Sequence, residues 1–336
     1  MRALATIARV EELKPIEGAD RICAYRIRNW WVVDQVHKYS VGDLVTYYEI
    51  DSFIPINDEF EFLRKSSYKK LPDGSEGFRL RTVKLKGQVS QGLITPIPSS
   101  YSGSIVEDAD LTEILGITKY EPPIPAHLSG DAKGAFPSFI PKTDEDRIQN
   151  IKPAEFDSWR DLNLYATEKI DGSSVTIYYN NGDFGVCSRN LELKRNEANS
   201  YWSEVINLDL EKKLQTLGRN LAVQGELFGN KIQGNKYKKN NRHIKFFTIF
   251  DIDSQTRVPY NEFVSICKTL GLDTVPLVME NFTIGNTSTE KLLEISDNNS
   301  EVTPDVLREG IVVRDYDNTI SFKVINNSWL IKYNKD

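Results

Sequence analysis

Short runs of alternating apolar and polar residues dominate the first third of this chain. Four such runs are clear, at residues 22–27, 30–33, 44–50 and 78–85, and turn-forming residues at 39–43 and 70–74 separate them. Alternation with a period of two residues is typical of strands that bury one face. Five or so short strands in about 100 residues predict a small closed β-barrel over residues 1–118, and the OB-fold is the barrel that fits best.

The rest of the chain mixes strand-like and helix-like patterns. Strands are expected at 164–179, 184–189, 222–228, 244–251, 310–314 and 319–325, and helices near 195–217, 260–270 and 288–296. Because strands and helices do not alternate strictly, the pattern favours an α+β domain at 151–336.

Residues 119–150 have the composition of a linker that ends in a helix. The proline-rich stretch at 121–125 is expected to be stiff, and the glycine-containing stretch at 129–134 is expected to be flexible. Thr143, with Asp146 three residues later, is a helix-start signature and predicts a lead-in helix at 143–150.

Composition excludes several classes of protein. No apolar run reaches the roughly 18–20 residues that cross a bilayer, and the N-terminus has no signal-peptide pattern. Cys23, Cys187 and Cys267 are scattered without a C-x-x-C pair, and the three histidines are too dispersed for a histidine-based metal cage. We therefore expect a protein of the cytoplasm, or of an equivalent reducing compartment, without a membrane partner.

Charge is distributed unevenly along the chain. The net charge is −6, but residues 64–86 hold eight basic residues and two acidic ones. A basic stripe on an acidic protein is a candidate phosphate-binding face, and a solvated hairpin is the alternative. The expected nucleic-acid contacts lie in the strand predicted at 78–85 and just after it: Arg79, Arg81, Lys84 and Lys86.

The most informative motif is the tetrapeptide Lys169-Ile-Asp171-Gly172. It lies between an apolar strand-like segment and the β-rich run at 175–179. A lysine on such a short turn can attack the α-phosphate of a nucleotide and hold it as a phosphoramidate, which is covalent nucleophilic catalysis. The alternative for the tetrapeptide alone is a β-hairpin with a surface lysine and an Asp-Gly turn.

Five further blocks follow this motif in order, at 187–190, 223–229, 245–251, 308–314 and 320–323. They read Cys-Ser-Arg-Asn, Val-Gln-Gly-Glu-Leu-Phe-Gly, Lys-Phe-Phe-Thr-Ile-Phe-Asp, Arg-Glu-Gly-Ile-Val-Val-Arg and Ile-Ser-Phe-Lys. The ordered series resembles the motif set of the covalent nucleotidyltransferases, namely polynucleotide ligases and mRNA capping enzymes. The resemblance implies an ATP-grasp-like ligase domain built on antiparallel sheets.

The resemblance also implies roles for individual residues. Lys169 is the expected nucleophile, and the nearby cations Lys323 and Arg189, with a metal, are expected to lower its pKa. Mg²⁺ or Mn²⁺ is expected near three carboxylates, mostly through water: Asp171, Glu226 and Glu309. The nucleotide site is expected to include Phe247 stacked on adenine, Glu168 at the purine edge, and Arg189 with Asn190 at the ribose or a 5′-phosphate. A buried core position is the alternative for Phe247, and Phe246 is expected to occupy such a position.

The order of the domains is similar to that of the Deinococcus-type RNA ligases, the fifth RNA ligase family. Capping enzymes and most DNA ligases carry the OB domain after the nucleotidyltransferase domain, whereas here the barrel is expected before Lys169 and the chain ends soon after Lys323. This resemblance implies a monomer that uses ATP to seal 3′-OH/5′-phosphate nicks in RNA or RNA–DNA duplexes whose 3′-OH strand is RNA. The alternatives are a DNA ligase, a guanylyltransferase or a non-catalytic RNA-end-binding protein.

One departure from the superfamily pattern concerns the last motif. It usually reads Lys-x-Lys, but here Lys323 has Ser321 before it and Ile325 after it. The second cation beside the α-phosphate is therefore not identified by sequence, although Lys332 lies close along the chain.

Overall fold

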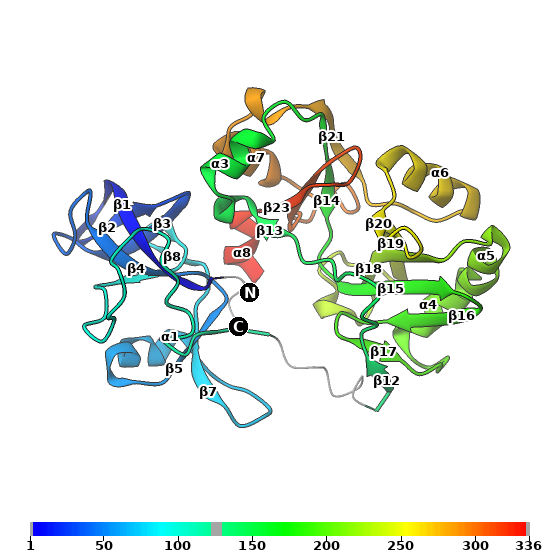
Figure 1. Ribbon diagram of the computed structural model, residues 1–336, viewed down its shortest axis with the longest axis horizontal. Coiled ribbons are helices and arrows are strands. Elements are labelled where there is room, and N and C mark those ends of the chain that lie inside the picture. Colours follow the sequence, from blue (N-terminus) through cyan, green and yellow to red (C-terminus); the bar gives the residue numbers. More distant parts are fainter. Residues whose placement is uncertain (1–2, 122–129, 334–336) are drawn as a thin grey trace. The chain divides into compact units, whose positions relative to one another are not determined.

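The computed structural model describes residues 3–121 and 130–333, which form two compact units (Figure 1). The first unit holds the described residues up to Glu121 together with Leu330–Tyr333, and the second runs from Gly130 to Trp329. Most of the proline-rich stretch at 121–125, and His127, lie outside the described residues.

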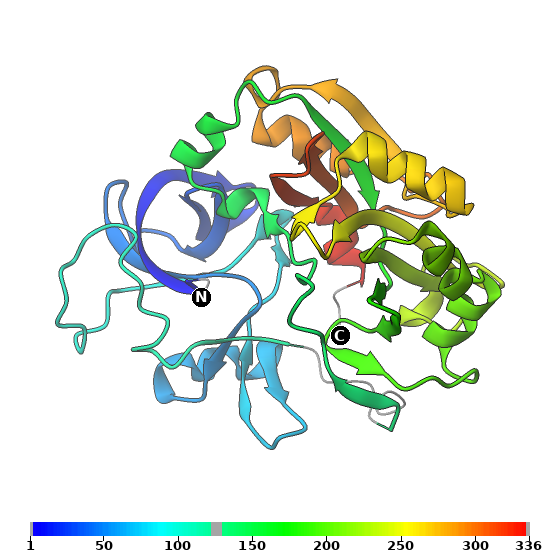
Figure 2. The same ribbon diagram turned by 45° about the vertical axis from the view of Figure 1, so that its right-hand side comes forward.

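The first unit is built around a curved antiparallel sheet in the order β10-β4-β1-β2-β3. Its strands are β1 (Ala5–Ile16), β2 (Ala19–Ile27), β3 (Trp30–Gln35), β4 (Leu44–Tyr48) and β10 (Leu93–Thr95). β1 pairs with β4 along its first half and with β2 along its second, and the register shifts between Val10 and Glu12. Such a bulge bends a strand, and β1 curves through a wide arc in Figure 2.

The inward side chains of this sheet form an aromatic and aliphatic core that includes Val10, Tyr25, Ile27, Trp30 and Tyr47. Trp30 is buried, whereas Trp31 on the opposite face is partly exposed, with the Lys14 ammonium 5.8 Å from its ring.

A smaller antiparallel sheet and two short helices complete the first unit. The sheet contains β5 (Ser52–Pro55), β6 (Tyr68–Lys70), β7 (Glu76–Arg79) and β11 (Thr118–Lys119). The helices η1 (Asp58–Leu63) and α1 (Arg64–Ser67) were not predicted, because ten residues are too few to show a helical period.

The single strand predicted at 78–85 is wrong. The chain leaves the sheet at Leu80, whose backbone bonds to Ser52 and Asp51, and it resumes as a separate hairpin of β8 (Val83–Leu85) and β9 (Gln88–Ser90). Leu80 and Thr82 are both buried, so the alternating burial continues through residues where the strand itself is interrupted.

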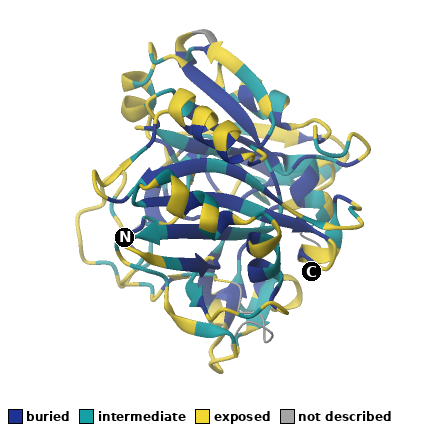
Figure 3. Ribbon diagram, turned by 90° about the vertical axis from the view of Figure 1, so that its right-hand side faces the viewer, coloured by how far each residue is buried: buried dark blue, intermediate teal, exposed yellow. Residues whose placement is uncertain are grey.

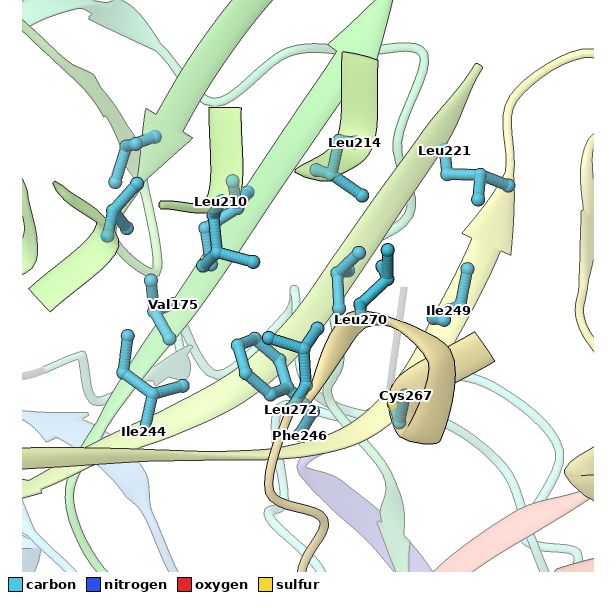
Figure 4. Packing of buried hydrophobic residues seen from close by; sticks show 14 of the residues in the cluster. Val175, Leu210, Leu214, Leu221, Ile244, Phe246, Ile249, Cys267, Leu270 and Leu272 are labelled. Carbon is cyan, nitrogen blue, oxygen red and sulfur yellow. The ribbon is translucent and has the colours of Figure 1, made fainter. Parts of the chain in front are cut away.

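The second unit contains a seven-stranded sheet covered on one face by helices. Its strands, in spatial order, are β12 (Ala132–Ala135), β17 (Leu191–Leu193), β16 (Asp183–Cys187), β15 (Ser173–Asn180), β18 (Leu221–Gly229), β19 (Arg242–Asp251) and β20 (Thr256–Arg257). The covering helices are α4 (Ser200–Asn207), α5 (Leu210–Leu217) and α6 (Tyr260–Leu270). Figure 4 shows their shared core, which includes Val175, Leu210, Leu214, Phe246 and Cys267.

A five-stranded sheet forms the rest of the second unit. Its order is β13 (Asp146–Arg147), β23 (Ser321–Ile325), β22 (Gly310–Asp315), β14 (Leu164–Lys169) and β21 (Leu277–Phe282). Two helices accompany this sheet, α3 (Pro153–Ser158) and α7 (Thr289–Ser296). The remaining elements are three short 3-10 helices, η2 (Ile148–Asn150), η3 (Gln233–Asn235) and η4 (Ile284–Asn286), and the terminal helix α8 (Asn327–Tyr333). In Figure 3 the strands are mostly dark blue, whereas the helices carry yellow on their outer turns.

Most strands and helices predicted for the second half are confirmed, and so is the α+β class with mostly antiparallel sheets. The single strand predicted at 164–179 is wrong, because β14 and β15 are separate strands of different sheets, and the helix predicted near 195–217 is two helices, α4 and α5. The lead-in helix predicted from Thr143 is wrong. Residues Asp146–Arg147 are extended and pair in parallel with β23, and the next α-helix begins only at Pro153. Pairing with the sheet edge therefore overrides the local capping signal. Among the residues that the structure describes, no helix has the length and apolar character needed to cross a membrane.

A buried ion pair lies inside the second unit. The Arg314 guanidinium, with its side chain 2% exposed, donates to Glu145 at 2.6 Å. Burial raises the pKa of Glu145, but the charge of Arg314, together with a backbone hydrogen bond and the charges of Lys323 and Arg257, holds that pKa below its usual range. The pair therefore stabilises the fold only while Glu145 is ionised.

We predict that Glu145→Ala lowers the free energy of unfolding by about 3 kcal/mol, because it leaves the Arg314 charge buried without its carboxylate. Urea unfolding measures the change. Glu211→Ala, which breaks the exposed pair between Arg195 and Glu211, should cost less than about 1 kcal/mol. Equal costs for the two variants would contradict the prediction.

Candidate active site

Lys169 lies where the two sheets of the second unit meet. It is the last residue of β14 and pairs with Gly310 of β22 in the five-stranded sheet. After an interval of only three residues the chain begins β15, which belongs to the seven-stranded sheet (Figure 1). The turn at 170–172 therefore places the lysine at the junction.

Close packing explains the glycine of this turn. A Cβ atom on Gly172 would lie closer to the carbonyl oxygen of Leu227 than real Cβ atoms come to such a neighbour, and it would press on the side chain of Glu226. Ile170, which is buried, fixes the turn from inside, where it packs with Phe228 and Tyr237.

Two residues between β18 and β19 hold the same turn, and sequence reasoning missed both. The backbone N–H of Asp171 donates to the Tyr237 phenol oxygen at 2.9 Å. The Lys236 ammonium donates to the Asp171 carboxylate at 2.6 Å. Nothing in the sequence of this loop marks the two residues as partners of a turn 65 residues away.

Carboxylates surround the Lys169 ammonium. Its Nζ donates to Oε2 of Glu309 at 2.7 Å. Burial lowers the pKa of Lys169, but the negative charges of Glu309, Glu226 and Asp171 outweigh burial and raise it above the usual range. In the protein alone, Lys169 is therefore held as an ammonium, and the lower pKa expected with Lys323, Arg189 and a metal stays a prediction.

The same carboxylates repel one another. Burial and the charge of Glu309 raise the pKa of Asp171 to about 6, although Lys236 opposes the shift. Burial also raises the pKa of Glu226 to about 8, against the attraction of Lys169. This excess of negative charge is what a divalent cation would relieve.

A metal would not be caged by protein groups alone. Within residues 3–121 and 130–333, no three or more His, Cys, Asp or Glu side chains gather closely enough to hold an ion. Mg²⁺ prefers oxygen ligands and keeps several waters, and the carboxylates of Asp171, Glu226 and Glu309 offer oxygen atoms of that kind.

Lys323 and Arg189 meet at a shared carboxylate. The Lys323 ammonium lies 3.5 Å from Oδ1 of Asp144, and the Arg189 guanidinium lies 3.5 Å from Oδ2. Asn190, beside Arg189, accepts a hydrogen bond from Lys142 at 2.8 Å.

Arg147 is the cation next to Lys323. The two residues are paired in the register of β13 and β23. Burial lowers the pKa of Lys323 to about 8, and the charges of Arg147 and Lys169 act in the same direction against Asp144. Ser321 and Ile325, where the superfamily has a second lysine, pair with Arg314 and Gly310, and Ile325 is buried.

A bulge sets the position of Phe247. β18 and β19 pair Gln224 with Thr248 and Gly225 with Phe246, so Phe247 is the extra residue of β19. Bulges redirect side chains and are frequent beside active sites. Phe246 is fully buried in the core, as predicted, whereas Phe247 is partly exposed, with the Arg314 guanidinium 5.7 Å from its ring.

Glu168 is buried, and both of its carboxylate oxygens have protein partners. They accept hydrogen bonds from the Ser300 hydroxyl and the Glu301 backbone N–H. Burial raises the pKa of this carboxyl against those two hydrogen bonds. Contact between Glu168 and the purine edge therefore stays a prediction. The structure gives this carboxylate another role, which is to hold the loop at Ser300 and Glu301.

Two of the four predicted nucleic-acid residues have partners within the first unit. The Arg79 guanidinium lies 3.1 Å from the Asp51 carboxylate and 4.3 Å from the Tyr120 ring, and Arg81 donates to the Ser66 carbonyl. These contacts are internal to the first unit. Lys84 and Lys86 are exposed on the β8–β9 hairpin.

We predict that Lys323 loses its positive charge as the pH rises through about 8, whereas ordinary lysines keep theirs to about pH 10. NMR of ¹³Cε-labelled lysine should show one signal that titrates near this pH. The signal should vanish in Lys323→Arg. Titration of every lysine above about pH 10 would contradict the assignment.

Comparison with known proteins agrees with this architecture. An OB-fold domain model matches residues 4–97, and an RNA ligase model matches residues 162–332. No curated protein matches the chain. The solved structures that are similar include Naegleria gruberi RNA ligase with PPi, 38% identical at a TM-score of 0.90 over 100% of both chains.

Two mutant structures of that enzyme are similar in the same way. A lysine mutant with ATP and Mn is 37% identical at a TM-score of 0.88 over 99% of this chain and 100% of that chain. A glutamate mutant with AMP and Mn is 37% identical at a TM-score of 0.89 over 100% of both. The predicted order of an OB-fold followed by a ligase domain is confirmed. The chain belongs to the RNA ligase family.

Proposed function

We propose that this RNA ligase is of the Deinococcus type and uses ATP to seal 3′-OH/5′-phosphate nicks in duplexes whose 3′-OH strand is RNA. The observation that carries the proposal is the Lys169 ammonium, 2.7 Å from Glu309 among three carboxylates. The Naegleria structures with ATP and Mn, AMP and Mn, and PPi support ATP as the substrate and a divalent cation as the cofactor.

In the first step, Lys169 takes AMP from ATP. Deprotonated Nζ forms a bond to the α-phosphorus, the bond from that phosphorus to the bridging oxygen breaks, and pyrophosphate leaves. Glu309 Oε2, which already accepts a hydrogen bond from Nζ, can receive the ammonium proton. A divalent cation, when bound, would neutralise phosphate charge and favour the neutral amine.

In this proposal, the Lys323 ammonium neutralises negative charge on the α-phosphate. Arg147, its neighbour in the sheet register, supplies the second cation that the last motif lacks. Fixed cations aimed at a phosphate stabilise the charge that develops during transfer. In this proposal Arg147 therefore replaces the missing lysine of the last motif, and the absence of that lysine no longer favours a non-catalytic role.

The remaining residues bind the two other parts of the substrates. Phe247, partly exposed at its bulge, stacks on the adenine, and Arg189 with Asn190 binds the ribose or the incoming 5′-phosphate. AMP then passes from Lys169 to the 5′-phosphate, and the 3′-OH attacks that phosphate and displaces AMP.

Incubation with α-labelled ATP and Mg²⁺ or Mn²⁺ should leave a covalent label that acid removes and alkali does not, as for a phosphoramidate. Lys169→Ala should take up no label, because it lacks the nucleophile. Lys268→Ala, which removes an exposed lysine of α6, should label as the wild type does. Label on the Lys169→Ala protein would overturn the assignment, and labelling by GTP alone would indicate a guanylyltransferase.

The β8–β9 hairpin should contribute to binding of the nicked duplex. Each phosphate contact releases counterions, so Lys84→Ala with Lys86→Ala should reduce the slope of log affinity against log salt by about two. Binding to a nicked duplex with an RNA 3′-OH strand measures this slope, and labelling by ATP should not change.

Lys212→Ala with Lys268→Ala removes the same charge from exposed sites on α5 and α6 and serves as the matched control. Equal slopes for the two double variants would show that the hairpin lysines are only solvated surface.

A further inference from the structure

Tyr237 is a buried aromatic residue with a polar contact that the mechanism above does not use. It lies between β18 and β19, is 2% exposed, and packs with Ile170, Phe228 and Val275. Phe247 packs against the same cluster. The cluster that contains Tyr237 therefore joins Ile170, next to Lys169, with the neighbourhood of Phe247.

The phenol oxygen of Tyr237 satisfies the backbone at the turn that carries Lys169. The N–H of Asp171 falls in the gap between β14, which ends at Lys169, and β15, which begins at Ser173. It donates to the phenol oxygen at 2.9 Å. A buried backbone N–H without a partner is costly, so this hydrogen bond favours one backbone geometry of the turn.

The segment around Tyr237 also binds the loop that leads to Glu309. The Tyr237 carbonyl accepts a hydrogen bond from the Thr303 hydroxyl at 3.2 Å, and the Lys239 ammonium donates to the Val302 carbonyl at 2.8 Å. One short segment thus contacts both the turn of Lys169 and the loop before Glu309. The side chains of these two residues meet, with Lys169 Nζ 2.7 Å from Glu309 Oε2.

We propose that Tyr237 is a positioning residue for transfer of AMP to Lys169. Its phenol oxygen fixes the turn so that Nζ faces the α-phosphate in line with the leaving oxygen. This inference rests on the proposed function, in which Lys169 is the nucleophile. Displacement of a reacting group by about 1 Å can cost about 100-fold in rate, even without any loss of substrate binding.

A purely structural role makes a different prediction. If Tyr237 only fills space, phenylalanine replaces it without effect on the reaction, because the ring and its packing are kept. If the phenol only stabilises the fold, its loss lowers the fraction of active protein and leaves the rate constant of the active molecules unchanged.

The test is single-turnover labelling of Tyr237→Phe with α-labelled ATP and Mn²⁺. We expect the rate constant at saturating ATP to fall about 10- to 100-fold, while the half-saturating ATP concentration and the final extent of labelling stay close to wild type. Tyr178→Phe is the matched control, because the Tyr178 phenol is also buried in the second unit and donates to Glu192 at 2.7 Å. It should label at the wild-type rate.

Thermal unfolding of both tyrosine variants completes the comparison, since each loses one buried hydrogen bond. A wild-type rate constant for Tyr237→Phe would overturn the inference and leave the proposed function standing. A reduced final extent with an unchanged rate constant would also overturn it. Absence of label on the wild-type protein would overturn the proposed function, and this inference with it.

Discussion

The ion pair between Lys169 and Glu309 is the interaction on which the site depends. It joins the end of β14 to the loop before β22, and two further carboxylates share its field. In a buried environment such charges interact strongly, so the position of one group constrains the others. The pair also defines what ATP and its metal must change, because an ammonium cannot act as a nucleophile until it loses a proton, and the negative charge around it opposes that loss.

The two sheets of the second unit contribute different groups to the site around this ion pair. The five-stranded sheet contributes Lys169 and Lys323, the groups proposed to act on the α-phosphate, while the seven-stranded sheet contributes Glu226 and Phe247. The helices α4, α5 and α6 bury the opposite face of the seven-stranded sheet. The apolar face of each sheet thus stabilises the unit, and the polar face is left for chemistry.

The sequence was sufficient to predict elements with a clear hydrophobic period and residues that belong to a motif. The long strands and α6 follow from alternation and helical spacing, and Lys169, Glu309 and Lys323 follow from ordered blocks. The signals that failed were local: the cap at Thr143 was overridden by pairing with β23, and the apparent strand at 78–85 breaks at Leu80. Tyr237 and Arg147 were missed because their contacts exist only after distant segments pack together, and no spacing along the chain encodes them.

The crossing between the sheets has a consequence for how far the site can open. Four peptide units connect Lys169 with Ser173, and a fully extended chain of that length spans at most about 14 Å. The sheets therefore cannot separate beyond this limit at the base of the site, whatever happens at their far edges. Any wider opening must therefore come from movement of the far edges of the sheets, while Lys169 stays close to the junction.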